Sequence, residues 1–148
     1  MRILSLLFAS LVVLASLPGF GLAADRVDDL KARVEKANGD ERIKICTQIA
    51  ELQLSSADKL YTAGNAADAR SAVDEVASYL EKARDSAIET GRRLKETEIA
   101  ARKAARRLED IKRTLAFEDQ PPLDQSIKRL ESVRTSLLER MFRKDKKK

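Results

Sequence analysis

The chain has 148 residues and a formal net charge of +5, and it contains no His and no Trp. The lack of His excludes the usual catalytic triads and nearly all zinc and haem sites, which depend on imidazole. Ala, Leu, Glu, Lys and Arg, which favour helices, occur throughout, whereas aromatic residues make up 4% of the sequence. We therefore predict an all-α protein that is not an enzyme and that holds no cofactor and no metal.

The N-terminus has the three parts of a secretory signal peptide: a positive start at Arg2, an apolar run over residues 3–17, and a small-residue exit at residues 21–24. A membrane-spanning helix needs about 20 apolar residues, and this run has 15. We therefore expect residues 1–24 to be removed as the chain is exported to the periplasm or secreted, with an N-terminal membrane anchor as the alternative. No Cys directly follows the apolar run, which excludes lipid attachment there.

Charge is unevenly distributed along the rest of the chain, in which residues 25–142 are long enough for a single helical domain. Residues 25–91 carry ten Lys and Arg against fourteen Asp and Glu, whereas residues 92–113 carry nine against four. Residues 143–148 carry five basic side chains and one acidic one, with nothing apolar to bury, so we expect a disordered basic tail. The sequence thus predicts an acidic front, a basic middle and a basic end.

The first two helices are predicted over residues 26–37 and 41–63, because apolar residues recur there every three or four positions. Asp40 is placed to cap the second helix by accepting hydrogen bonds from its free N–H groups. Gly64 ends this helix because Gly tolerates a left-handed backbone, and Asn65 can cap the next helix.

Cys46 is the single cysteine, so the chain cannot form an intramolecular disulfide. It lies among isoleucines in the second predicted helix. Because free Cys is among the most buried residue types, we expect Cys46 in the core, with an intermolecular disulfide as the alternative.

The third predicted helix is long, spanning residues 66–117, and its apolar residues form a heptad seam. One set recurs every seven residues: Val73, Leu80, Ala87, Leu94, Ala101, Leu108 and Leu115. A second set follows the first by three residues: Val76, Ala83, Thr90, Thr97, Ala104 and Ile111. Such a seam is typical of a coiled coil or a helix buried against others, and a second copy of the chain could complete it. We expect a bend near Gly91, because Gly in a helix interior costs about 1 kcal/mol relative to Ala.

The last helix is predicted over residues 122–142, since Pro121 and Pro122 suit a first helical turn. Its apolar residues keep the helical spacing to the end of this range: Leu123, Ile127, Leu130, Val133, Leu137, Leu138, Met141 and Phe142. A short connection makes it fold back antiparallel along residues 96–117. The predicted fold is therefore an elongated bundle of antiparallel helical hairpins.

Small and apolar residues flank a tight connection over residues 61–64, with Ala57 and Leu60 before it and Ala69 and Val73 after it. Over residues 53–81 this pattern resembles one tetratricopeptide repeat, a pair of closely packed helices. The sequence departs from the family pattern at three positions: Gln53, Ser56 and Glu81. The resemblance implies a tight helical hairpin and says little about peptide binding.

One group of basic residues has the spacing of a positive stripe beside the heptad seam, and these are the candidate anion-binding residues: Arg92, Lys95, Arg102, Arg106 and Arg113. With the basic tail, they could attract anionic lipid headgroups or acidic polysaccharide. Nucleic acid is a less suitable partner, because no aromatic residues are interleaved for base stacking and the chain is expected to be exported. A solvated charged surface is the alternative interpretation.

The sequence thus favours an exported, non-catalytic helical protein that acts as a scaffold, adaptor or protein-interaction module in the cell envelope or outside the cell. Binding of anionic surfaces through residues 92–113 and the tail is the second hypothesis. The identity of a protein partner cannot be predicted from the residues.

Overall fold

The computed structural model describes residues 19–145, in which five α-helices and one short 3₁₀ turn follow one another and no strand occurs. The all-α prediction is therefore confirmed for this part of the chain. The elements are α1 (Gly19–Val34), α2 (Gly39–Thr62), α3 (Ala66–Thr90), α4 (Leu94–Arg113), η1 (Phe117–Asp119) and α5 (Pro121–Asp145).

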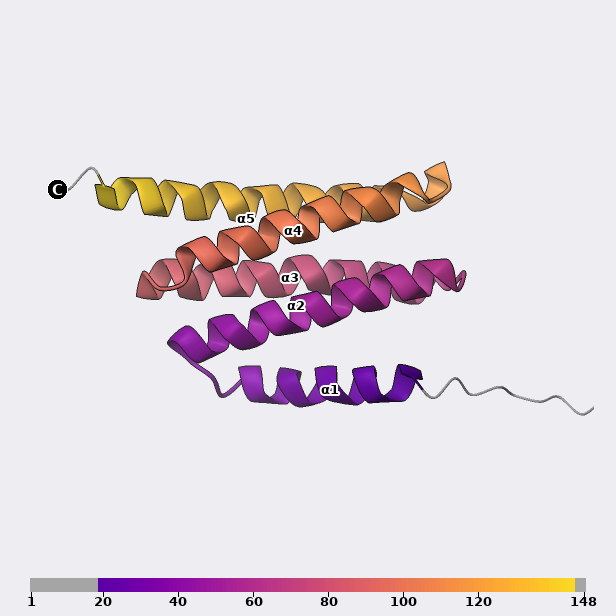
Figure 1. Ribbon diagram of the computed structural model, residues 1–148, viewed down its shortest axis with the longest axis horizontal. Helices are drawn as coiled ribbons and strands as arrows, with labels where there is room; N and C mark the ends of the chain where they lie inside the picture. Colours follow the sequence, from indigo (N-terminus) through magenta and orange to yellow (C-terminus); the bar gives the residue numbers. More distant parts are fainter. Residues whose placement is uncertain (1–18, 146–148) are drawn as a thin grey trace, which may run out of the picture.

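Consecutive helices run antiparallel and stack in chain order, from α1 at one edge to α5 at the other (Figure 1). In this view α2 and α4 lie toward the reader, and α3 and α5 lie behind them. The most extensive packing joins α2 to α3 and α4 to α5, and α3 also packs against α5. The fold is thus two helical hairpins, α2–α3 and α4–α5, stacked side by side, with α1 covering the outer side of α2.

The long helix predicted over residues 66–117 is wrong as a continuous element. The helix breaks at the predicted weak point: Gly91 ends α3 with a φ of 68°, and Arg93 precedes α4 with a φ of 51°. Two left-handed residues so close together reverse the chain instead of bending it. As a result, α3 and α4 pack against each other and against α5 within one chain.

Most of the heptad seam is nevertheless buried in both α3 and α4, although Thr90 at the end of α3 is exposed. Val73, Val76 and Leu80 on α3 are at most 1% exposed, and Ala101 and Leu108 on α4 are 0% exposed. The seam is therefore covered by helices of the same chain, so a homo-oligomer, which stays a prediction, would need another surface.

Glycine accounts for the turn between α2 and α3. Gly64 has a φ of 78°, in the left-handed region that favours Gly. The predicted cap at Asn65 is confirmed, since its side chain accepts from the N–H of Asp68 and donates to the Asp68 carboxylate over 2.7 Å. The predicted cap at Asp40 is wrong: α2 begins at Gly39, two residues before its predicted start, and the Asp40 carboxylate instead lies 2.7 Å from the Nε of Arg93.

The two outer helices extend beyond their predicted limits. Helix α1 begins at Gly19, within the predicted signal peptide, and α5 continues to Asp145, so the first residues of the predicted tail are helical. Pro121 begins α5 as expected. Residues 1–18, which hold most of the predicted signal, and residues 146–148 lie outside the described part, in which no helix is long and apolar enough to cross a membrane.

The core contains Cys46, as predicted. Its side chain is 0% exposed, and burial raises the pKa of its thiol, which disfavours the reactive thiolate. The buried apolar side chains form one cluster that extends from Val27 on α1 to Leu137 on α5.

Cross-helix ion pairs connect the acidic front to the basic middle of the chain. Arg93, directly before α4, pairs with Asp40 of α2. Arg107, within α4, pairs with Asp58 of α2. Lys112 of α4 pairs over 2.8 Å with Asp124 of α5. Part of the uneven charge in the sequence is therefore used in ion pairs between neighbouring helices.

Candidate functional site

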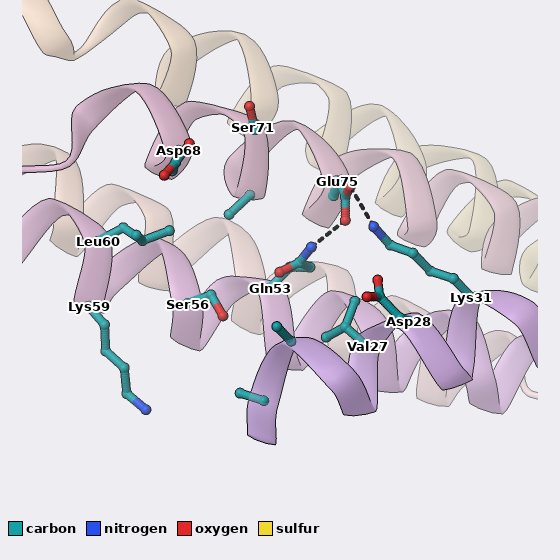
Figure 2. Close-up of a pocket in the computed structure, with 13 residues that line it drawn as sticks. Val27, Asp28, Lys31, Gln53, Ser56, Lys59, Leu60, Asp68, Ser71 and Glu75 are labelled. Atoms are coloured by element: carbon teal, nitrogen blue, oxygen red, sulfur yellow. Dashed lines mark hydrogen bonds and ion pairs between the residues drawn. The ribbon is translucent and has the colours of Figure 1, made fainter. Parts of the chain in front are cut away.

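A hollow of about 260 Å³ lies between α1, over residues 23–31, and the α2–α3 hairpin (Figure 2). We call it the α1 groove. Its walls combine small and apolar residues with polar ones: Ala23, Ala24, Val27, Asp28, Lys31, Gln53, Ser56, Lys59, Leu60, Asp68, Ser71, Ala72 and Glu75. A groove with this mixture can hold an apolar side chain and orient it by polar contacts.

Glu75 is the centre of the polar side of the α1 groove. Its carboxylate accepts a hydrogen bond from the Nζ of Lys31 over 2.7 Å and another from the side-chain amide of Gln53, so that α1, α2 and α3 meet at one carboxylate (Figure 2). Lys31 and Glu75 are about one-third exposed. This network connects α1 to the α2–α3 hairpin.

A second groove runs between α2 and α4, where the two hairpins lie side by side. It consists of two hollows of about 390 and 350 Å³ that share Thr47 and Glu51. We call it the α2–α4 groove. Its lining is small or apolar at Ala50, Ala100 and Ala104. The sequence analysis missed this groove because it depends on α4 returning beside α2.

Ion pairs lie at both ends of the α2–α4 groove. Asp40 lies beside Arg93 at one end and Asp58 beside Arg107 at the other. Contacts with Lys44 and then Arg93 hold the pKa of the Asp40 carboxyl below its usual value, so this pair stays charged near neutral pH. The two aspartates are separated by a helical rise of roughly 27 Å, which matches about eight residues of extended chain.

Four of the five candidate anion-binding residues lie on one side of α4. Lys95, Arg102, Arg106 and Arg113 follow one another at intervals of seven, four and seven residues, which places them on neighbouring turns. All but the half-buried Arg102 are exposed. Arg92 is also exposed, but it lies in the turn before α4. The predicted stripe therefore forms along the helix, and we call these four residues the α4 stripe.

Acidic neighbours moderate the α4 stripe. Arg102 lies 3.7 Å from Glu98, and Arg113 lies 3.7 Å from Asp110. A hollow of about 280 Å³ between α4 and α5 contains Arg102 and Arg106, but its lining also includes two glutamates, Glu109 and Glu131. The stripe is thus a moderately positive surface, and the structure does not form a closed anion pocket from it.

The C-terminal end of α5 differs from its prediction. Phe142 is 63% exposed, although the helical spacing placed it with the apolar residues of α5. Beside it, Leu138 lines a shallow hollow of about 330 Å³ to which only α5 contributes. The reason is orientation: Phe142 follows the buried Leu137 by five residues, which places it roughly 140° from Leu137 around α5, on a side to which no other helix contributes.

Within residues 19–145, no group of three or more His, Cys, Asp or Glu side chains is placed to hold a metal ion. No protein-family model, no curated protein and no solved structure matches the chain. The relation of the α2–α3 hairpin to tetratricopeptide repeats therefore stays a prediction.

Proposed function

We propose that the chain is an exported, non-catalytic protein-interaction module, a scaffold or adaptor in the cell envelope or outside the cell, which binds a segment of a partner protein in the α2–α4 groove. The observation that carries the proposal is the groove itself. It has a floor of small side chains and is about as long as a short extended peptide.

The charges along the groove support a protein segment as the ligand. Glu51 and Lys103 line it from opposite sides, on α2 and α4, and both are exposed. A partner segment with one basic and one acidic side chain would complement both rims. Catalysis is less well supported, because the chain has no His to act as the usual general base.

Site-specific photo-crosslinking tests this proposal. A photoreactive amino acid replaces Ser55, an exposed residue that lines the α2–α4 groove, and in a control it replaces Ser132, an exposed residue of α5 outside it. We expect one partner protein from the exported fraction to crosslink at residue 55 and not at residue 132. Equal crosslinking at both positions, or none at residue 55, would contradict the proposal.

A groove-filling variant gives an independent check. Ala100→Phe places a large side chain in the α2–α4 groove, whereas Ala67→Phe places the same side chain on an exposed part of α3. We expect Ala100→Phe to abolish the crosslink at residue 55 and Ala67→Phe to retain it. Circular dichroism checks that both variants keep the helical content of the original chain.

The α4 stripe supports a second candidate function, the binding of anionic surfaces such as lipid headgroups or acidic polysaccharide. Its four basic residues occupy one side of α4, and the chain ends in further lysines. We expect binding to anionic vesicles or heparin to weaken as salt rises, because salt screens exposed charges. Arg102→Gln with Arg106→Gln should weaken it at low salt, and absence of binding by the original chain at low salt would refute this function.

A further inference from the structure

The C-terminal end of α5 combines an exposed Phe and a half-buried Leu with a concentration of positive charge. Phe142 is 63% exposed, and it lines a hollow together with Leu138 and Arg143. Arg143 is 80% exposed and lies 3.8 Å from Glu139, so most of its charge faces solvent. In the sequence, four lysines and one Asp follow Arg143.

Phe117, which is also exposed, has the opposite electrostatic surroundings. Phe117 is 82% exposed, but Glu118 and Asp119 follow it directly in η1. Of the two phenylalanines whose exposure the structure describes, both are exposed, and Phe142 is the one beside basic residues. The pair of sites provides a matched comparison within one chain.

We propose that the C-terminal end of α5 docks on an anionic lipid bilayer. Phe142 and Leu138 enter the interface between headgroups and acyl chains, Arg143 contacts the headgroup phosphates, and the net positive charge of the sequence after it adds electrostatic attraction. The inference rests on the second proposed function and makes it more specific, because it identifies the anionic surface as lipid. It also adds an apolar contact with the acyl chains, which a polysaccharide does not offer.

Two structural features favour a bilayer as the partner. The basic tail has a net charge of +4 over residues 143–148, which complements anionic headgroups. Leu138 and Phe142 lie one helical turn apart and line a hollow to which α5 alone contributes, so that a flat surface can contact both side chains. Each basic residue close to an anionic membrane strengthens binding by roughly fivefold.

The chain has no Trp, so a single introduced Trp reports on its own site. Phe142→Trp and Phe117→Trp are each mixed with vesicles of phosphatidylcholine, with or without phosphatidylglycerol, at low salt. We expect the emission of Trp at residue 142 to shift to shorter wavelength with the vesicles that contain phosphatidylglycerol, and not with vesicles of phosphatidylcholine only. Trp at residue 117 should not shift, and a shift at both positions or at neither would overturn the inference.

Vesicle cosedimentation measures how much each part contributes. We expect Phe142→Ala to weaken binding to the anionic vesicles about tenfold, since burial of a Phe side chain is worth at least this factor. Phe117→Ala should bind as the original chain does. Replacing Lys146, Lys147 and Lys148 by Gln should weaken binding at low salt and have little further effect at high salt.

The α4 stripe variant separates this inference from the function on which it rests. If Arg102→Gln with Arg106→Gln loses binding while Phe142→Ala does not, docking through the end of α5 is refuted and binding through the α4 stripe is supported. The reverse result supports the end of α5 and refutes the stripe. If sedimentation without lipid shows dimers that Phe142→Ala converts to monomers, the occupant is a second copy and the lipid proposal is overturned.

Discussion

Gly64 shows how a single residue determines the path of the chain. Its φ of 78° lies in the left-handed region, and a Cβ placed on it would meet no atom within 4 Å. Any cost of a side chain there therefore comes from the backbone and not from a clash. A substitution at Gly64 therefore measures the cost of the left-handed backbone conformation without a contribution from a steric clash.

We expect Gly64→Ala to lower the free energy of unfolding by about 1–2 kcal/mol, because an L-residue with a side chain is disfavoured in the left-handed region. Gly64→Asn should cost less, since Asn visits that region more readily. Urea denaturation of both variants measures the difference. Equal stability of the Ala variant and the original chain would show that the turn relaxes to another conformation.

Arg129 joins α5 to α3 through several hydrogen bonds. Its guanidinium donates to the Glu81 carboxylate over 2.8 and 2.9 Å and to Asp74 over 2.7 Å. The hydrogen bond from Arg129 holds the pKa of the Glu81 carboxyl below its usual value. A lowered pKa in the folded state means that the ionised carboxylate stabilises the fold.

This contribution should depend on pH in a defined direction. It is fully present above the unfolded-state pKa of about 4.3, and it is lost as the pH falls through the lower folded-state pKa. We expect Glu81→Gln to cost about 1 kcal/mol at neutral pH and progressively less toward pH ~3, because the pair is partly exposed. Urea denaturation at both pH values tests this, with Glu139→Gln, at an exposed pair, as the control.

At the scale of elements, α5 contains two adjacent leucines with different surroundings. Leu137 is 0% exposed in the core, and Leu138 lines the outer hollow. We expect Leu137→Ala to cost about 2–5 kcal/mol, as for other fully buried leucines, and Leu138→Ala to cost less than about 1 kcal/mol. Thermal or urea unfolding measures both; similar losses would mean that the face of α5 has been assigned wrongly.

The helix faces could be predicted from the sequence, but the connection between α3 and α4 could not. Most of the heptad positions are buried in both helices, because each helix has to bury one face whichever partner covers it. The spacing of seven from Ala87 to Leu94 passes through the turn without interruption. Periodicity alone therefore cannot distinguish a bend at Gly91 from a reversal, which depends on the left-handed conformations of Gly91 and Arg93.

The candidate binding sites, too, could be predicted only in part from the sequence. The spacing of Lys95, Arg102, Arg106 and Arg113 depends only on α4 being a helix, so their common side could be predicted. The α2–α4 groove and the exposure of Phe142 depend on which helices lie side by side and which side of each helix its neighbours cover. Those are properties of tertiary packing, which a single sequence does not encode in any local pattern.

For the molecule as a whole, the reversal at Gly91 makes a prediction about distance. A continuous helix would separate residues 67 and 116 by roughly 74 Å, whereas Arg70 of α3 lies 2.8 Å from Asp119 of η1. We expect spin labels at Ala67→Cys and Ala116→Cys, in a Cys46→Ala background, to report less than about half of the separation calculated for a rod. A distance near the rod value would refute the stacked hairpins.

The start of α1 has a consequence for maturation. Ala23 and Ala24 belong to α1 and form part of the wall of the α1 groove, yet both lie at the predicted signal-peptide exit. Cleavage before Asp25 would remove that wall, and the remaining helix would begin with Asp25 and Asp28 near its positive end, which suits an N-terminus. The precursor and the processed chain would then differ at this groove, so a ligand that recognises the open form would distinguish protein that has crossed the membrane from protein that has not.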